Sequence, residues 1–199
     1  MGIESTRIGI LLFDGVEELD AVGPWEVLSA WATIFPQDGV GVSTYSPGGS
    51  MVTCAKGMRI GSDGAIEDAP KLDVFLHPGG WGTRELLHDA NHLALIRALS
   101  ASSGLMTSVC TGSLVFAAAG LLSGRPATTH WESLELLRQL DPTCTVVEGV
   151  RFVDDGDLIS AAGVSAGIDM ALHLVSRIAG ADRAREVRRD IQYDPDPSV

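Results

Sequence analysis

The chain has 199 residues, which is enough for one domain with a sizeable core, and we expect a single domain over residues 1–199. Its 45% hydrophobic and 20% charged residues are typical of a globular protein. The formal net charge of -12 argues against a nucleic-acid partner, because phosphate backbones bind clustered Lys and Arg.

No apolar run is long enough to span a membrane, and residues 1–7 lack the pattern of a signal peptide. The three cysteines, at positions 54, 110 and 144, are odd in number and far apart, which fits a reducing cytoplasm better than a disulfide framework. We therefore expect a cytoplasmic protein. His88 and His92 stand four residues apart on an expected helix, but no third ligand is apparent, so a surface helix face is favoured over a metal site.

Short apolar runs of strand character alternate with segments of helical spacing. In chain order we expect strand 7–13, helix 16–32, strand 40–45, one or two short strands within 52–60, strand 72–76, helical segments within 83–100, strand 104–109, helices 112–121 and 134–140, strands 144–147, 151–153 and 158–161, and helices 165–179 and 182–192. The tail from residue 193 is expected to fray. This alternation predicts an α/β fold whose mostly parallel sheet has helices on both faces.

In such folds the functional site lies at the carboxyl ends of the strands. Three segments follow predicted core strands, and we expect them on one rim of the sheet: residues 14–20, 79–82 and 110–112.

Cys110 is the strongest candidate, because it stands between a predicted strand and a predicted helix. A sharp strand-to-helix turn exposes a side chain at the top of the sheet, and the helix N-terminus favours thiolate over thiol. The alternative is a buried apolar cysteine, which is the commonest fate of a free cysteine. The local sequence favours the nucleophile, whereas for Cys54 and Cys144 the buried alternative holds.

The loop after the preceding strand contains Gly79 and Gly80, whose backbone N–H groups could approach a ligand as an oxyanion hole requires. A plain loop is the alternative, and a dinucleotide site is disfavoured because the G-x-G-x-x-G spacing is absent. Asp20 could exchange a proton with the thiolate, but residue type alone favours an N-cap. His130 could be a base for the cysteine, and we favour a structural histidine that hydrogen-bonds near a helix start.

The sequence resembles the ThiJ/PfpI superfamily, relatives of the class I glutamine amidotransferases, and within it the isocyanide hydratases. The matching stretches are residues 10–28, 73–82, 107–131 and 163–172, which together run across nearly the whole chain. The most specific are Ser-Val-Cys-Thr-Gly-Ser at 108–113 and Ala-Thr-Thr-His-Trp at 127–131.

This resemblance implies a flavodoxin-like sandwich, a homodimer and a small-molecule substrate, with no metal or organic cofactor. It implies Cys110 as nucleophile, Asp20 as its acidic partner in place of the N-cap, and Thr111 beside Asp20. Thr111 stands where the superfamily's proteases have a histidine, which disfavours a Cys-His peptidase. Ala161-Ala162 replaces expected glycines and is expected to narrow the pocket.

Two other functions remain open. One is another cysteine enzyme of the same fold, such as a cofactor-free glyoxalase or deglycase, or an amidase-like hydrolase. These glyoxalases typically use a glutamate where this chain has Asp20. The other is a non-catalytic ligand-sensing domain, as in modules fused to helix-turn-helix regulators. The sequence ends about where the sheet domain should, so we expect no DNA-binding segment.

Overall fold

A computed structural model describes residues 5–195. The absent signal peptide and the fraying tail were predicted partly from residues 1–4 and 196–199, which lie outside this range. The fold is built on a seven-stranded sheet of order β10-β11-β7-β6-β1-β2-β5. These strands are β1 (Thr6–Leu11), β2 (Val40–Ser46), β5 (Gly64–Ala65), β6 (Val74–His77), β7 (Leu105–Val109), β10 (Phe152–Asp154) and β11 (Leu158–Ala161).

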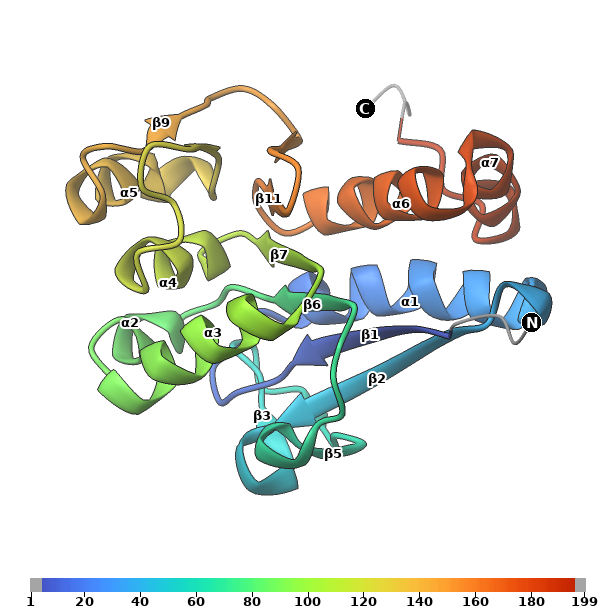
Figure 1. The fold of residues 1–199 in the computed structure, drawn as a ribbon, viewed down its shortest axis with the longest axis horizontal. Coiled ribbons are helices and arrows are strands. Elements are labelled where there is room, and N and C mark those ends of the chain that lie inside the picture. The colour runs from blue at the N-terminus through green and yellow to red at the C-terminus, as the bar shows by residue number, and fades with distance from the viewer. Residues whose placement is uncertain (1–4, 196–199) are drawn as a thin grey trace.

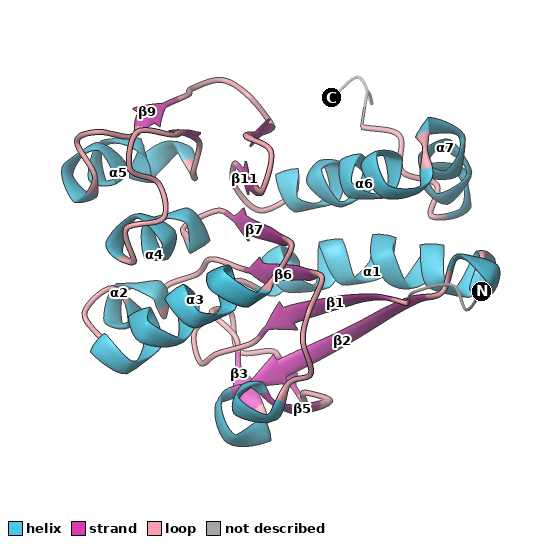
Figure 2. Cartoon of the chain, viewed as in Figure 1, coloured by secondary structure: helices cyan, strands magenta, loops and turns pink. Residues whose placement is uncertain are grey.

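All neighbouring strands in this sheet are parallel except β10 and β11, which form an antiparallel hairpin. Helices cover both faces, as Figures 1 and 2 show. One group comprises α1 (Glu18–Ile34), α6 (Ala166–Ala179) and α7 (Ala181–Asp190), and the other α2 (Thr83–Leu86), α3 (Ala90–Ser102), α4 (Gly112–Ala118) and α5 (Leu134–Leu140). The predicted α/β sandwich is confirmed. Among the described residues, no helix is both long and apolar enough to cross a bilayer.

The central strands are buried on both faces because their residues are almost all apolar or small. Every residue of β6 and β7 is buried, as are the last four of β1. Continuous apolar runs of this kind have to lie inside a covered parallel sheet, and this is why the positions of these strands could be predicted from the sequence. Their order places the ends of β1, β6 and β7 next to one another, so the predicted rim is present.

One local prediction was wrong, namely that His88 and His92 share a surface helix face. The helical segments expected within 83–100 are α2 and α3, and the two are separate because Asp89 accepts hydrogen bonds from the backbone N–H groups of Asn91 and His92 and so caps a new helix. His88 therefore lies exposed before α3, while His92 is buried within it, and the two share no surface face. The strand predicted at 144–147 is β9 (Thr145–Val146), which pairs with β8 (Pro126–Ala127) outside the main sheet. Region 52–60 forms the expected short strands, β3 (Val52–Thr53) and β4 (Arg59–Ile60).

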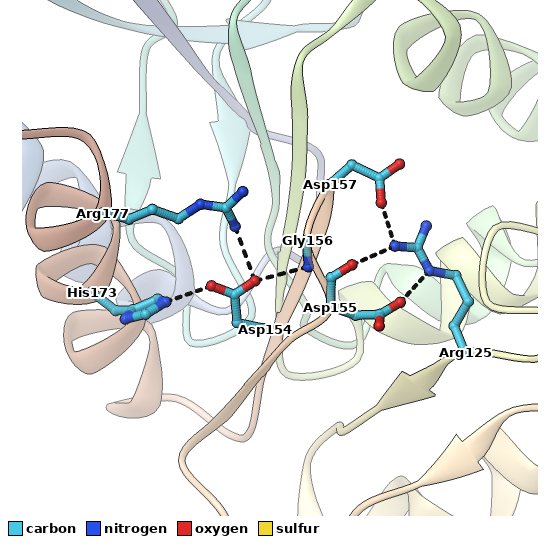
Figure 3. Close-up of polar contacts among 7 residues, drawn as sticks. All are labelled: Arg125, Asp154, Asp155, Gly156, Asp157, His173 and Arg177. Carbon is cyan, nitrogen blue, oxygen red and sulfur yellow. Dashed lines mark hydrogen bonds and ion pairs between the residues drawn. The ribbon is translucent and has the colours of Figure 1, made fainter.

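The β10–β11 hairpin is held at its turn by two groups of hydrogen bonds and ion pairs (Figure 3). Asp154 binds His173 Nε2 at 2.7 Å and Arg177 Nη1 at 2.9 Å, both from α6. On the other side, Arg125 binds Asp155 at 2.5 Å and also contacts Asp157. These contacts anchor β11, whose far end supplies hydrogen bonds to the candidate site.

Candidate active site

Cys110 follows β7 in a left-handed backbone conformation, with φ of 57°. Such a conformation is uncommon for a residue with a side chain and persists where its surroundings hold it. Its N–H lies 3.1 Å from the carbonyl of Ala161 and 2.8 Å from that of Ala162. Its carbonyl accepts hydrogen bonds from Ser113 Oγ at 3.1 Å and Thr129 Oγ1 at 2.8 Å. The predicted sharp turn between strand and helix is therefore present and fixed at both ends.

The protonation state of Cys110 differs from the sequence prediction of a thiolate. Burial and the negative charge of Asp20 raise the pKa of the Cys110 thiol to about 12. Hydrogen bonds from the backbone N–H groups of Thr111 and Val164 lower this pKa, but they are outweighed. A helix N-terminus alone does not decide the charge of a thiol that is only 6% exposed. The resting side chain is a thiol that needs a base.

Asp20 lies in the first turn of α1 and is fully buried. It is not the N-cap, because Glu17 occupies that position. Its Oδ2 instead accepts a hydrogen bond from the Gly79 N–H at 2.9 Å, and its Oδ1 has no hydrogen-bond partner among the described residues. Burial raises the pKa of Asp20 to about 7, although Gly79 and the Cys110 side chain both lower it. The carboxyl and the thiol thus influence each other's titration, and Asp20 is poised to change charge near neutral pH.

The two loop glycines do not offer free N–H groups, as an oxyanion hole would require. Gly79 N–H is bound by Asp20, and Gly80 N–H donates to Thr111 Oγ1 at 2.9 Å. Thr83 Oγ1 donates to the Gly80 carbonyl at 2.7 Å and lies 3.0 Å from Thr111 Oγ1. In this structure the loop therefore positions Asp20 and Thr111, and the backbone N–H groups that act on the thiol, by lowering its pKa, are those of Thr111 and Val164.

Gly79 lies between Asp20 and Thr111, and the two are so close to it that there is no room for a side chain at position 79. A Cβ there would lie 2.5 Å from Thr111 N and 2.9 Å from Asp20 Oδ2. We expect Gly79→Ala to displace the carboxyl and lower the rate of Cys110 alkylation by roughly tenfold or more, a modest geometric change having a large effect on a reacting pair. The rate is measured with iodoacetamide. Gly61→Ala is the control, since a Cβ there meets nothing within 4 Å, and an unchanged rate in Gly79→Ala would contradict the expectation.

His130 stands at the start of a short 3-10 turn, where its Nδ1 accepts the Glu132 N–H at 3.4 Å. Its ring packs against Gly163, where a Cβ would lie 2.3 Å from His130 Cδ2. Within residues 5–195 no hydrogen bond joins it to Cys110. This geometry agrees with the structural histidine that we favoured, although the ring also lines the pocket beside the cysteine.

A pocket of about 170 Å³ opens onto Cys110. Its wall contains the predicted Gly80, Thr111 and His130, and six residues that the sequence did not single out for chemistry: Glu17, Trp81, Arg84, Glu132, Ser133 and Val164. Each of these six lies within about four residues of a predicted motif in the sequence. That they line one cavity is a result of the fold and could not be predicted from those motifs. Ala161 and Ala162 do not line this pocket, and their carbonyls hold the Cys110 N–H. The described part of the chain contains no cluster of three or more His, Cys, Asp or Glu suited to a metal.

The site combines a covered parallel sheet, a cysteine on a strained turn and a buried acid beside it. These features define a class of α/β proteins, and comparison with known proteins identifies the family. Residues 6–177 match the model of the DJ-1/PfpI family, and the chain belongs to that family.

Among curated proteins it is similar to an isonitrile hydratase of Pseudomonas putida, with 38% identity over 96% of this chain and 80% of the relative. It is also similar to the transcriptional regulator CdhR of Pseudomonas aeruginosa, at 34% identity, with 71% of this chain matching 42% of the regulator. The crystal structure of a ThiJ/PfpI family protein from Pseudomonas syringae superposes with a TM-score of 0.88 at 31% identity, covering 100% of this chain and 78% of that one. Drosophila melanogaster DJ-1beta gives 0.82 at 25% identity, covering 96% and 99%.

Proposed function

We propose that this protein is a cysteine-dependent isocyanide hydratase, which adds water to R–N≡C and releases the N-substituted formamide R–NH–CHO. Isonitrile and isocyanide are two names for the same group. The observation that carries the proposal is the pair of Cys110 and Asp20, in which a thiol that lines a small pocket lies beside a buried carboxyl with a pKa of about 7. The similarity to an isonitrile hydratase selects this reaction from those that such a pair can perform.

In the first step Asp20 takes the thiol proton as the Cys110 sulfur bonds to the terminal carbon of the isocyanide. The same proton then passes from Asp20 to that carbon, which gives the thioimidate R–N=CH–S–Cys110 and leaves Asp20 ionised. The N–H groups of Thr111 and Val164, which hydrogen-bond to the sulfur, stabilise its developing charge.

In the second step Asp20 takes a proton from a water molecule as the water oxygen bonds to the thioimidate carbon, and delivers that proton to the nitrogen. The carbon–sulfur bond then breaks and R–NH–CHO is released, while the hydroxyl proton of the adduct returns to the sulfur. One water is consumed, and the thiol and carboxylate are regenerated. Every proton transfer uses Asp20 or the sulfur, so the cycle needs no further base.

The test is to incubate the protein with cyclohexyl isocyanide in ¹⁸O-labelled water and to detect N-cyclohexylformamide by mass spectrometry. We expect the label in the formyl oxygen and no product above background from Cys110→Ser. Equal product from both proteins would overturn the assignment. Lactate from methylglyoxal, without any formamide, would favour the glyoxalase alternative. The homodimer and the cytoplasmic location remain predictions, and analytical ultracentrifugation tests the former.

The proposal also fixes the pH dependence. Asp20 must be ionised to accept the thiol proton, so kcat/KM is expected to rise with pH through a limb at about 7 and then to level off. The negative charge of Glu17 contributes to the raised pKa of Asp20. Glu17→Gln is therefore expected to move this limb to lower pH in a kcat/KM profile. A move to higher pH would show that another group controls the limb.

A further inference from the structure

Two histidines that the proposed reaction does not use lie hydrogen-bonded to each other behind the active-site loop. His77 is the last residue of β6 and is fully buried, and His92 in the first turn of α3 is 8% exposed. Their Nε2 atoms are 3.0 Å apart, and the rings meet edge to face at 86°. A buried imidazole pair needs an explanation, because the other rings around His77 are those of Phe13, Phe75 and Phe116, where an apolar side chain would pack without cost.

The hydrogen bonds fix where the protons lie. His77 Nδ1 is 2.7 Å from the carbonyl of Pro78, which can only accept, so Nδ1 carries the hydrogen. In the neutral ring Nε2 is then bare and accepts from His92 Nε2–H. Burial lowers the pKa of both rings, that of His77 to about 3, so both are neutral near pH 7. The nearby charged group is Asp89, which caps α3 and partly opposes the lowering at His92. The bonds therefore run in one direction, from His92 to His77 to Pro78.

The Pro78 carbonyl belongs to the same peptide group as the Gly79 N–H, and that N–H binds Asp20 Oδ2 at 2.9 Å. One rigid peptide plane is thus held from both ends, by His77 at its oxygen and by Asp20 at its nitrogen. A donor at the oxygen polarises the peptide and makes its N–H a stronger donor. The same segment also abuts the helix that follows Cys110, since a Cβ on Gly112 would lie 2.2 Å from the His77 carbonyl and 2.9 Å from that of Pro78.

We propose that His77 and His92 are positioning residues of the active site, which orient and polarise the Pro78–Gly79 peptide and through it hold the Asp20 carboxyl in its ionised form. The inference rests on the proposed function only in that Cys110 and Asp20 react as a pair. Loss of the His77 donor weakens the Gly79 N–H, and the weaker N–H stabilises the carboxylate less. The Asp20 limb then moves to higher pH.

The variants separate hydrogen bonding from space filling. In His77→Asn the amide nitrogen takes the place of Nδ1–H and keeps the bond to Pro78, whereas His77→Leu loses it. In His92→Gln the amide nitrogen takes the place of Nε2–H and keeps the bond to His77, whereas His92→Leu loses it. Folding of each variant is checked by circular dichroism and thermal unfolding.

The readout is the pH profile of Cys110 alkylation by iodoacetamide, located by mass spectrometry, because it requires no isocyanide. We expect His77→Leu to shift the limb near pH 7 to higher pH. Relative to wild type, its alkylation rate should therefore be reduced roughly threefold more at pH 6 than at pH 8.5. We expect His77→Asn to restore most of the wild-type profile. A purely structural role would lower stability and leave the limb in place, and that result would overturn the proposal, as would an Asn variant that behaves like Leu.

If His77→Leu does not fold, the comparison of His92→Gln with His92→Leu decides by the same criterion. The hydration assay is run in parallel on every variant. A wild-type protein that hydrates no isocyanide but shows the alkylation limb and its shift would refute the proposed function and leave the positioning role standing.

Discussion

Replacement of Cys110 by serine is expected to abolish isocyanide hydration, with a fall in kcat/KM of at least about 10⁴-fold. Serine keeps the shape of the side chain and the backbone turn, but its hydroxyl is a far weaker acid than the thiol. A carboxylate whose pKa is about 7 cannot deprotonate it to a useful extent. The measurement is formamide formation under saturating and subsaturating isocyanide, with alkylation by iodoacetamide confirming that the reactive thiol has gone.

Cys144→Ser is the matched control. Cys144 is also a free, buried cysteine, at 8% exposure, but it does not line the pocket that contains Cys110. We expect its replacement to leave kcat/KM within about twofold of wild type, as for a substitution distant from the reacting atoms. Hydration that survives in Cys110→Ser but is lost in Cys144→Ser would place the chemistry elsewhere in the fold.

The fold could be predicted because its central strands are defined by local sequence. The buried runs at β1, β6 and β7 and the turn residues after them identify both the sheet and its active rim. The misplacement of His92 arose where a single side chain overrides the average character of a segment. Asp89 interrupts a region of helical spacing because its carboxylate caps a new helix, and this moves His92 from the expected surface into the core.

The candidate site could be predicted as a set of residues but not as an electrostatic system. Cys110, Asp20 and Thr111 were identified, two of them through family resemblance, whereas the charge of the thiol was predicted wrongly. A strand-to-helix turn is visible in the sequence near position 110, but the carboxyl that raises the thiol's pKa comes from position 20. The depth of burial, which dominates both pKa shifts, depends on how β1, β6 and β7 align. The hydrogen bond from position 79 to Asp20 is likewise a product of the fold.

Asp20→Asn is expected to slow hydration by about 10² to 10⁴-fold, the usual contribution of a positioned proton-transfer group. The asparagine oxygen can still accept the Gly79 N–H, so the local geometry is retained while the capacity to hold a proton is lost. The limb of the kcat/KM profile near pH 7 should disappear with the carboxyl. Asp141→Asn is the control, since Asp141 is another buried aspartate, bonded to Thr143 and Ser123 away from the pocket. It is expected to leave hydration close to wild type.

In Asp20→Asn the Cys110 thiol should ionise more easily than in wild type, although the variant hydrates isocyanide more slowly. Because the negative charge of Asp20 raises the pKa of Cys110, its removal lowers that pKa, and the thiolate forms at a lower pH than in wild type. Ultraviolet absorbance of the thiolate measures this directly. A nucleophile that ionises more easily yet turns over more slowly separates the role of Asp20 as a proton carrier from any role in activating the sulfur electrostatically. If hydration instead rose together with the thiolate population, Asp20 would be an inhibitory neighbour and the two-step proton transfer would be wrong.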